Sequence, residues 1–245
     1  MRLWCLHGNL QTPEVWQHIG DRWWERTWTR EVKLELVDVW ASEDSDFRQW
    51  AQMFCDRVRS HALVGEPQWL MGYSLGGRLA FHALLESPQL WTGGVAIAAD
   101  PGIPTEDERA QCLQRDRTWG RRFVSESWEI LLQEWDRQAV FAGYACGVER
   151  SEAAFDRRRI CQLFDRFSKG RQADLRPALA QLTQPPLLYI SGQADRKYSA
   201  IGAALAKRCP TVTHAVVPAA GHRVPWENSA GFVRALQQFV RSQVS

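Results

Sequence analysis

Leu70-Met71-Gly72-Tyr73-Ser74-Leu75-Gly76-Gly77-Arg78-Leu79-Ala80 is the stretch that decides the fold of this 245-residue chain. An apolar run typical of a buried strand passes into a helical pattern, and one serine lies between glycines at the change. Gly72, Ser74 and Gly76 fit G-x-S-x-G, in which the serine is exposed on a sharp strand-to-helix turn. Glycines at both flanks remove side chains that would clash there. The stretch predicts a nucleophilic serine, against the alternative of an ordinary tight turn.

Short apolar runs and longer amphipathic runs alternate around this stretch. Each apolar run is short enough for a buried parallel strand; the runs lie at 3–6, 33–39, 68–73, 93–99, 185–191 and 214–220. We expect helices in the amphipathic runs, at 47–63, 76–87, 198–209 and 230–243. The alternation predicts an α/β fold with a mostly parallel sheet of about six strands, flanked by helices.

Residues 104–176 interrupt the alternation. They contain charged helical sequence with aromatic residues and no run typical of a strand. We interpret them as a helical cap inserted before the acid-bearing strand, between a first core part, 1–103, and a second core part, 177–245. Inserted segments of this kind often form lids over sites.

The serine needs a histidine to take its proton and a carboxylate to orient that histidine. Asp195 and His222 follow the last two apolar runs, which gives the chain order serine, acid, histidine. Both lie at carboxyl ends of strands, where open α/β sheets place their sites. Asp100 is a rival for the acid, and we favour Asp195 because its loop precedes the strand that leads to His222. We assign no catalytic part to the histidines at the start of a strand or on helix faces, His214, His18, His61 and His82.

Two backbone donors are needed to stabilise developing negative charge at such a serine. Leu75 directly follows the serine, and Asn9 lies in the loop after the first strand. We expect the N–H groups of Leu75 and Asn9 to form this oxyanion hole, and His7 to brace the loop that carries Asn9.

Composition excludes several classes of partner. A net charge of +2 and a pI near 8.3, without a basic block, argue against nucleic-acid and membrane binding. No apolar run approaches the ~18 residues of a membrane span, and the start of the chain lacks a secretory pattern. The six cysteines are scattered without a C-x-x-C pair, and no metal or phosphate-loop motif is present. We expect a cytoplasmic protein without metal or cofactor; the sequence favours neither a monomer nor an oligomer.

Four short motifs carry a resemblance to the α/β-hydrolase fold: L-H-G at 6–8, G-Y-S-L-G-G-R at 72–78, G-Q-A-D at 192–195 and A-G-H at 220–222. The two amino-terminal strands of that fold have no counterpart ahead of the first apolar run. A narrower resemblance lies in GYSLGGRLA, EWDRQAVFAG and GQADRKYSAIGAALA. These segments closely resemble the 2-succinyl-6-hydroxy-2,4-cyclohexadiene-1-carboxylate synthases of menaquinone and phylloquinone biosynthesis. The resemblance implies a lyase that eliminates pyruvate from a tricarboxylate precursor, a small anionic substrate.

The resemblance also implies roles for individual residues. It places the catalytic triad on Ser74, Asp195 and His222, with the serine, activated by the histidine, removing a ring proton. It places substrate-binding positions on Tyr73, Arg78, Trp135 and Arg166, and an arginine suits a polyanionic substrate because it is a forked, permanently charged donor. Where the family has a further arginine this chain has Cys112, and we expect Arg115, one turn on, to substitute for it.

Two other functions stay open on the sequence. A carboxyl-ester hydrolase, acting for example on an acyl-carrier-protein-linked or small ester, has the same triad and elbow. A non-catalytic binding protein of the same fold is the alternative of another class, and the intact serine, acid and histidine argue against it.

Overall fold

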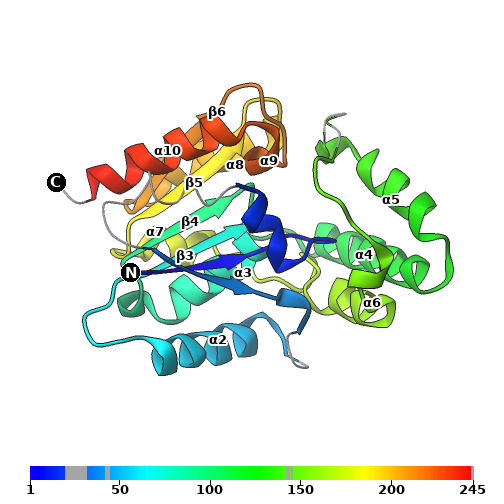
Figure 1. Ribbon diagram of the computed structural model, residues 1–245, viewed down its shortest axis with the longest axis horizontal. Coiled ribbons are helices and arrows are strands. Elements are labelled where there is room, and N and C mark those ends of the chain that lie inside the picture. Colours follow the sequence, from blue (N-terminus) through cyan, green and yellow to red (C-terminus); the bar gives the residue numbers. More distant parts are fainter. Residues whose placement is uncertain (20–31, 42–44, 142–143, 145, 244–245) are drawn as a thin grey trace.

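The computed structural model of the chain describes residues 1–19, 32–41, 45–141, 144 and 146–243. Within these residues, six strands form one sheet in the order β2-β1-β3-β4-β5-β6, and every neighbouring pair is parallel (Figure 1). The strands are β1 (Arg2–Leu6), β2 (Lys33–Val37), β3 (Gln68–Tyr73), β4 (Gly93–Ile97), β5 (Leu187–Gly192) and β6 (Val212–Val217). The six-stranded α/β sheet expected from the alternation of apolar and amphipathic runs is confirmed.

Helices connect the strands along the chain. The α-helices are α2 (Phe47–His61), α3 (Leu75–Glu86), α4 (Glu106–Ser125), α5 (Trp128–Asp136), α6 (Arg157–Arg166), α7 (Arg176–Gln181), α8 (Arg196–Arg208), α9 (Val224–Glu227) and α10 (Ser229–Ser242). Short 3-10 helices are η1 (Pro13–Ile19), η2 (Val39–Ala41), η3 (Pro88–Leu90), η4 (Ala139–Phe141) and η5 (Glu152–Ala154).

Each face of the sheet has its own hydrophobic core, because successive side chains of a strand point to opposite faces. In β1, Trp4 and Leu6 pack into the cluster that includes residues of α2 and α3. Leu3 and Cys5, between them, pack into the cluster that includes residues of η1 and α10. The sheet is thus covered on both faces, which is the arrangement a parallel sheet requires.

The last strand differs from its predicted range. The apolar run predicts a strand at 214–220, whereas β6 is Val212–Val217. Pro218 has no N–H to donate to a ladder, and the strand ends at the residue before it. The residues after it form the loop that leads to His222.

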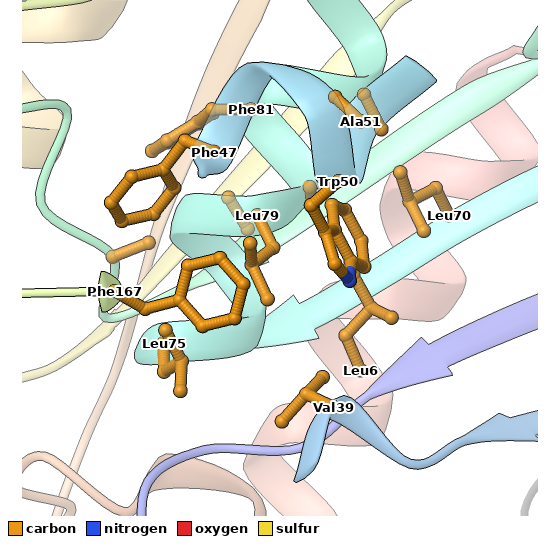
Figure 2. Packing of buried hydrophobic residues seen from close by; sticks show 14 of the residues in the cluster. Leu6, Val39, Phe47, Trp50, Ala51, Leu70, Leu75, Leu79, Phe81 and Phe167 are labelled. Atoms are coloured by element: carbon orange, nitrogen blue, oxygen red, sulfur yellow. The ribbon is translucent and has the colours of Figure 1, made fainter. Parts of the chain in front are cut away.

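Helices α4, α5 and α6 lie together beyond one end of the strands, apart from the helices that flank the sheet (Figure 1). Phe123 of α4 is at the centre of an aromatic cluster, with ring centroids of Trp128 and Phe164 5.6 and 5.8 Å away. Phe167, which follows α6, packs on Phe47 of the main core at 5.2 Å, and both belong to one hydrophobic cluster with Leu75 (Figure 2). The inserted helices therefore pack on one another through aromatic side chains, and these side chains are continuous with the hydrophobic cluster on the α2 and α3 face of the sheet. Their division into a cap domain stays a prediction.

Candidate active site

Ser74 occupies the single residue between strand β3 and helix α3. Its backbone has φ 51° and ψ −107°, a conformation that residues with a side chain rarely adopt. Glycines make the sharp turn possible: a Cβ on Gly72 would lie 2.6 Å from the Gly77 nitrogen, and one on Gly76 would lie 2.6 Å from the His7 carbonyl oxygen. The chain therefore reverses with backbone packed against backbone, and the serine hydroxyl is carried to the edge of the sheet.

His222 and Asp195 meet Ser74 at this edge. The Nδ1–H of His222 donates to Asp195 Oδ2 at 2.7 Å, and the His222 Nε2 lies 3.3 Å from Ser74 Oγ. Asp195 follows β5 and caps helix α8, where its Oδ1 accepts a hydrogen bond from the Tyr198 amide. The bond to Asp195 fixes the histidine tautomer, so the free Nε2 faces the serine hydroxyl. This is the geometry of a base that can take the serine proton.

Asp100, the rival acid, is engaged elsewhere. Its Oδ2 accepts from Lys169 Nζ at 3.2 Å and lies 3.6 Å from Lys197 Nζ, while its Oδ1 accepts from the Gly102 amide. The structure thus brings Asp195, and not Asp100, to His222.

The two expected oxyanion donors are the N–H groups of the residue after the serine and of a residue that lines the same cavity. Leu75 is the first residue of α3, so its N–H is one of the amides that have no partner within the helix. Asn9 lies in the turn after β1 and lines the same cavity as Ser74. His7 holds this turn, because its Nδ1 bonds to the Gly8 carbonyl and its Nε2 accepts from the Val39 amide. The roles of Leu75 and Asn9 stay a prediction.

Burial sets the protonation of the histidine. Removal from water lowers the pKa of His222, and the hydrogen bond and charge of Asp195 only partly offset this, so the net pKa is below 6.5. The imidazole is therefore neutral at pH 7 and able to accept a proton.

A cavity of about 540 Å³ opens over the triad. Of the predicted substrate-binding residues, Tyr73, Arg78, Arg115 and Trp135 line it, as does Cys112. Arg166 does not belong to the cavity lining. Helix α6 packs on α4 through its buried apolar side, and Arg166 is the last residue of that helix, with the next residue, Phe167, directed into the main core.

The cavity lining carries far more positive than negative charge. Two carboxylates belong to it within the described residues, Asp116 and Asp195, against seven cations. The cations are Arg78, Arg115, Arg150, Lys169, Arg196, Lys197 and Arg223. Sequence reasoning missed five of them. Arg196, Lys197 and Arg223 directly follow the acid and the histidine in the chain, which is a signal that could have found them; Lys169 and Arg150 carry no such signal.

Arg78 is a cation buried without a carboxylate. Its side chain is 6% exposed, its guanidinium lies 5.5 Å from the Phe47 ring centroid, and it donates to the neutral Oε1 of Gln172 at 3.2 Å. Within the part of the chain that the structure describes, no carboxylate forms an ion pair with it. A buried, unneutralised guanidinium on a cavity wall suits an anionic ligand.

The described residues offer neither a membrane-spanning helix nor a metal site. None of their helices is both long and apolar enough to span a membrane. No group of three or more histidine, cysteine or acidic side chains among them is placed to hold a metal ion.

The sequence and the fold of the chain are both similar to those of known proteins. The sequence profile of the alpha/beta hydrolase family matches residues 5–235. The 2-succinyl-6-hydroxy-2,4-cyclohexadiene-1-carboxylate synthase of Escherichia coli O1:K1 / APEC is 33% identical over 243 residues, which covers 96% of this chain and 92% of the relative. Among solved structures, MenH from S. aureus superposes with a TM-score of 0.85 at 17% identity, covering 100% of this chain and 95% of that one. The carboxylesterase CesB from Bacillus subtilis reaches a TM-score of 0.65 at 17% identity, covering 99% and 83%. The chain belongs to the α/β-hydrolase family and, within it, to the 2-succinyl-6-hydroxy-2,4-cyclohexadiene-1-carboxylate synthases.

Proposed function

We propose that the chain eliminates pyruvate from a tricarboxylate precursor and releases 2-succinyl-6-hydroxy-2,4-cyclohexadiene-1-carboxylate. The observation that carries the proposal is the Ser74, His222 and Asp195 array at the base of a strongly cationic cavity. The relationship to the Escherichia coli synthase supports it.

The reaction follows from the order of the hydrogen bonds. His222 Nε2 takes the proton of Ser74 Oγ, and Asp195 stabilises the imidazolium that forms. The serine oxygen then removes a proton from a ring carbon of the substrate. The released electron pair forms a ring double bond, and the carbon–oxygen bond to the enolpyruvyl group breaks. The leaving enolate receives the proton held by His222 to become pyruvate, which leaves the serine protonated and the histidine neutral again. The amides of Leu75 and Asn9 hold the negative charge that develops on oxygen.

The cations hold the substrate in place for this proton transfer. Arg78 lies one helical turn after the serine, because its amide donates to the Ser74 carbonyl at 3.0 Å. A carboxylate bound by its guanidinium is thereby kept close to the base. Arg115 and Trp135 line the cavity from the inserted helices and complete the binding surface.

We also propose a cytoplasmic location and a small carboxylate substrate. All six cysteines are free thiols, which supports a reducing compartment. The excess of cations over carboxylates in the cavity supports an anionic substrate.

Alanine substitution of the triad tests the mechanism. Ser74→Ala and His222→Ala should each lower pyruvate release about 100- to 10,000-fold, the contribution of a positioned acid–base group. Ser60→Ala is the matched control, because its hydroxyl lies on the exposed side of α2 and, among the described residues, bonds only to the Arg57 carbonyl and His61. Wild-type turnover by both triad variants would contradict the mechanism.

Ester hydrolysis is the second candidate, because the same triad is arranged for acyl transfer. A burst of nitrophenol from a nitrophenyl ester, abolished by Ser74→Ala and faster than conversion of the tricarboxylate, would favour it. The cationic cavity favours the polyanion, and we expect slow ester turnover without a burst.

A further inference from the structure

Asp100 holds two ammonium groups at the cavity wall. Its Oδ2 accepts from Lys169 Nζ at 3.2 Å and lies 3.6 Å from Lys197 Nζ. The Asp100 side chain is 7% exposed and lies outside the cavity lining, whereas both lysines belong to the lining. The carboxylate therefore lies outside a lining to which both of its lysine partners belong.

This arrangement leaves positive charge uncompensated. The single carboxylate of Asp100 forms ion pairs with both ammonium groups, and no other carboxylate among the described residues forms an ion pair with either lysine. Burial alone would lower the pKa of Lys169, but nearby groups that include the Asp100 carboxylate hold it above its ordinary value, so Lys169 is charged at neutral pH. Burial and the charge of Lys169 lower the pKa of Lys197. The pair thus presents a net positive charge that an anionic ligand group would neutralise.

Lys169 is fixed in position by its neighbours in the chain. The Ser168 hydroxyl donates to Asp116 Oδ2 at 2.6 Å and accepts from the Gly170 amide at 3.0 Å. Gly170 packs so closely on α4 that a Cβ there would lie 2.7 Å from the Leu113 Cβ. The lysine therefore projects from a short segment that is bonded on both sides.

The same network fixes Lys169 relative to Arg78. Gln172 accepts from the Arg78 guanidinium at 3.2 Å and donates to the Asp100 backbone carbonyl at 3.0 Å. Arg78 and the lysine pair are thus two cationic points on one wall, joined through Gln172 and Asp100. A fixed spacing of this kind selects ligands with more than one anionic group.

We propose that Lys169, positioned with Lys197 by Asp100, binds a carboxylate of the substrate at a second anion subsite, distinct from the one at Arg78. The inference rests on the proposed function and specifies how its polyanionic substrate is held. The ligands of the subsite are small molecules that carry two or more carboxylates.

Calorimetric titration with tricarballylate, a propane tricarboxylate, tests the subsite on the intact protein. Lys169→Gln should weaken tricarballylate binding about tenfold or more, as expected for loss of a hydrogen bond between charged groups. Lys169→Arg should retain most of the affinity. Lys207→Gln is the matched control, because this exposed lysine on α8 changes the net charge equally and lies outside the cavity lining.

Lys197→Gln is a second variant in which folding is not at risk, since its side chain is 60% exposed and Lys169 still neutralises Asp100. It should weaken binding less than Lys169→Gln does. In turnover, Lys169→Gln should raise KM for the tricarboxylate precursor with little change in kcat, because the contact is made equally in ground and transition states.

The outcomes separate this inference from the proposed function. Normal wild-type turnover, with unchanged KM and unchanged tricarballylate affinity in Lys169→Gln, overturns the subsite and leaves the synthase activity standing. Lys169-dependent tricarballylate binding without any wild-type turnover supports the subsite and overturns the reaction. Wild-type protein that does not bind tricarballylate at all also overturns the subsite.

Discussion

Gly76→Ala probes the contact between helix α3 and strand β1, on which the placement of the serine depends. A Cβ at this position would lie 2.6 Å from the His7 carbonyl oxygen and closer still to that of Leu6. Both are backbone atoms and cannot rotate away. Ordinary contact begins at 3.4 Å, so the helix and the strand must separate by about 1 Å.

The separation acts on both halves of the site. Gly76 lies two residues after Ser74, and Leu6 leads into the turn that carries Asn9. A displacement of about 1 Å between reacting groups costs on the order of 100-fold in rate, and overpacking costs about 1–3 kcal/mol of stability. We therefore expect kcat for pyruvate release to fall about 100-fold and the protein to unfold at lower urea concentration.

Steady-state pyruvate release and urea unfolding, measured on the same preparations, check this. Gly147→Ala is the matched control, because a Cβ there meets nothing within 4 Å. If Gly76→Ala keeps kcat within about threefold of wild type at unchanged stability, then the close backbone contact does not set the geometry of the serine.

Two further predictions concern pH. The acidic limb of kcat/KM should have an apparent pKa below 6.5, since burial lowers the pKa of His222 and only the neutral imidazole takes the serine proton. Asp195→Asn should move this limb to lower pH, because the Asp195 carboxylate raises the pKa of His222. A wild-type midpoint above 6.5 would contradict the assignment. Burial and, to a smaller extent, the charge of Arg78 lower the pKa of His82 to about 4 in the folded protein. Below pH 6.5 the unfolded chain therefore binds a proton at this histidine more readily than the folded protein does. His82 therefore contributes full stability above pH 6.5, which is lost as the pH falls toward 4. Urea unfolding at pH 7 and pH 5 should differ by about 2 kcal/mol more in wild type than in His82→Leu, and equal differences would refute the assignment.

The meeting of Ser74, Asp195 and His222 could be predicted because their placement depends on local patterns. The glycine spacing around Ser74 is a requirement of the turn itself, and Asp195 and His222 each follow an apolar run that ends at the same edge of the sheet. Parallel strands then bring together residues that are far apart in the chain. The sequence therefore carried both the identity and the meeting point of these side chains.

Chain order favoured Asp195 over Asp100, but the contacts that engage Asp100 elsewhere are in no local pattern. Asp100 is held by Lys169, which is 69 residues away in the chain and projects from a loop. Arg166 illustrates the same limit: its position on the last turn of α6 depends on how that helix packs on α4. Cavity cations contributed by loops were missed for this reason, since their direction is set by tertiary packing.

The backbone conformation of Ser74 lowers the stability of the folded protein. A residue with a side chain at φ 51° and ψ −107° stores strain on the order of 1–3 kcal/mol, which glycine at the same place would not. Selection for a stable fold alone would thus favour glycine at position 74, and a substitution to glycine should raise the melting temperature while removing the hydroxyl. In the proposed mechanism, the residue that lowers the stability of the fold is the one that carries the reactive hydroxyl.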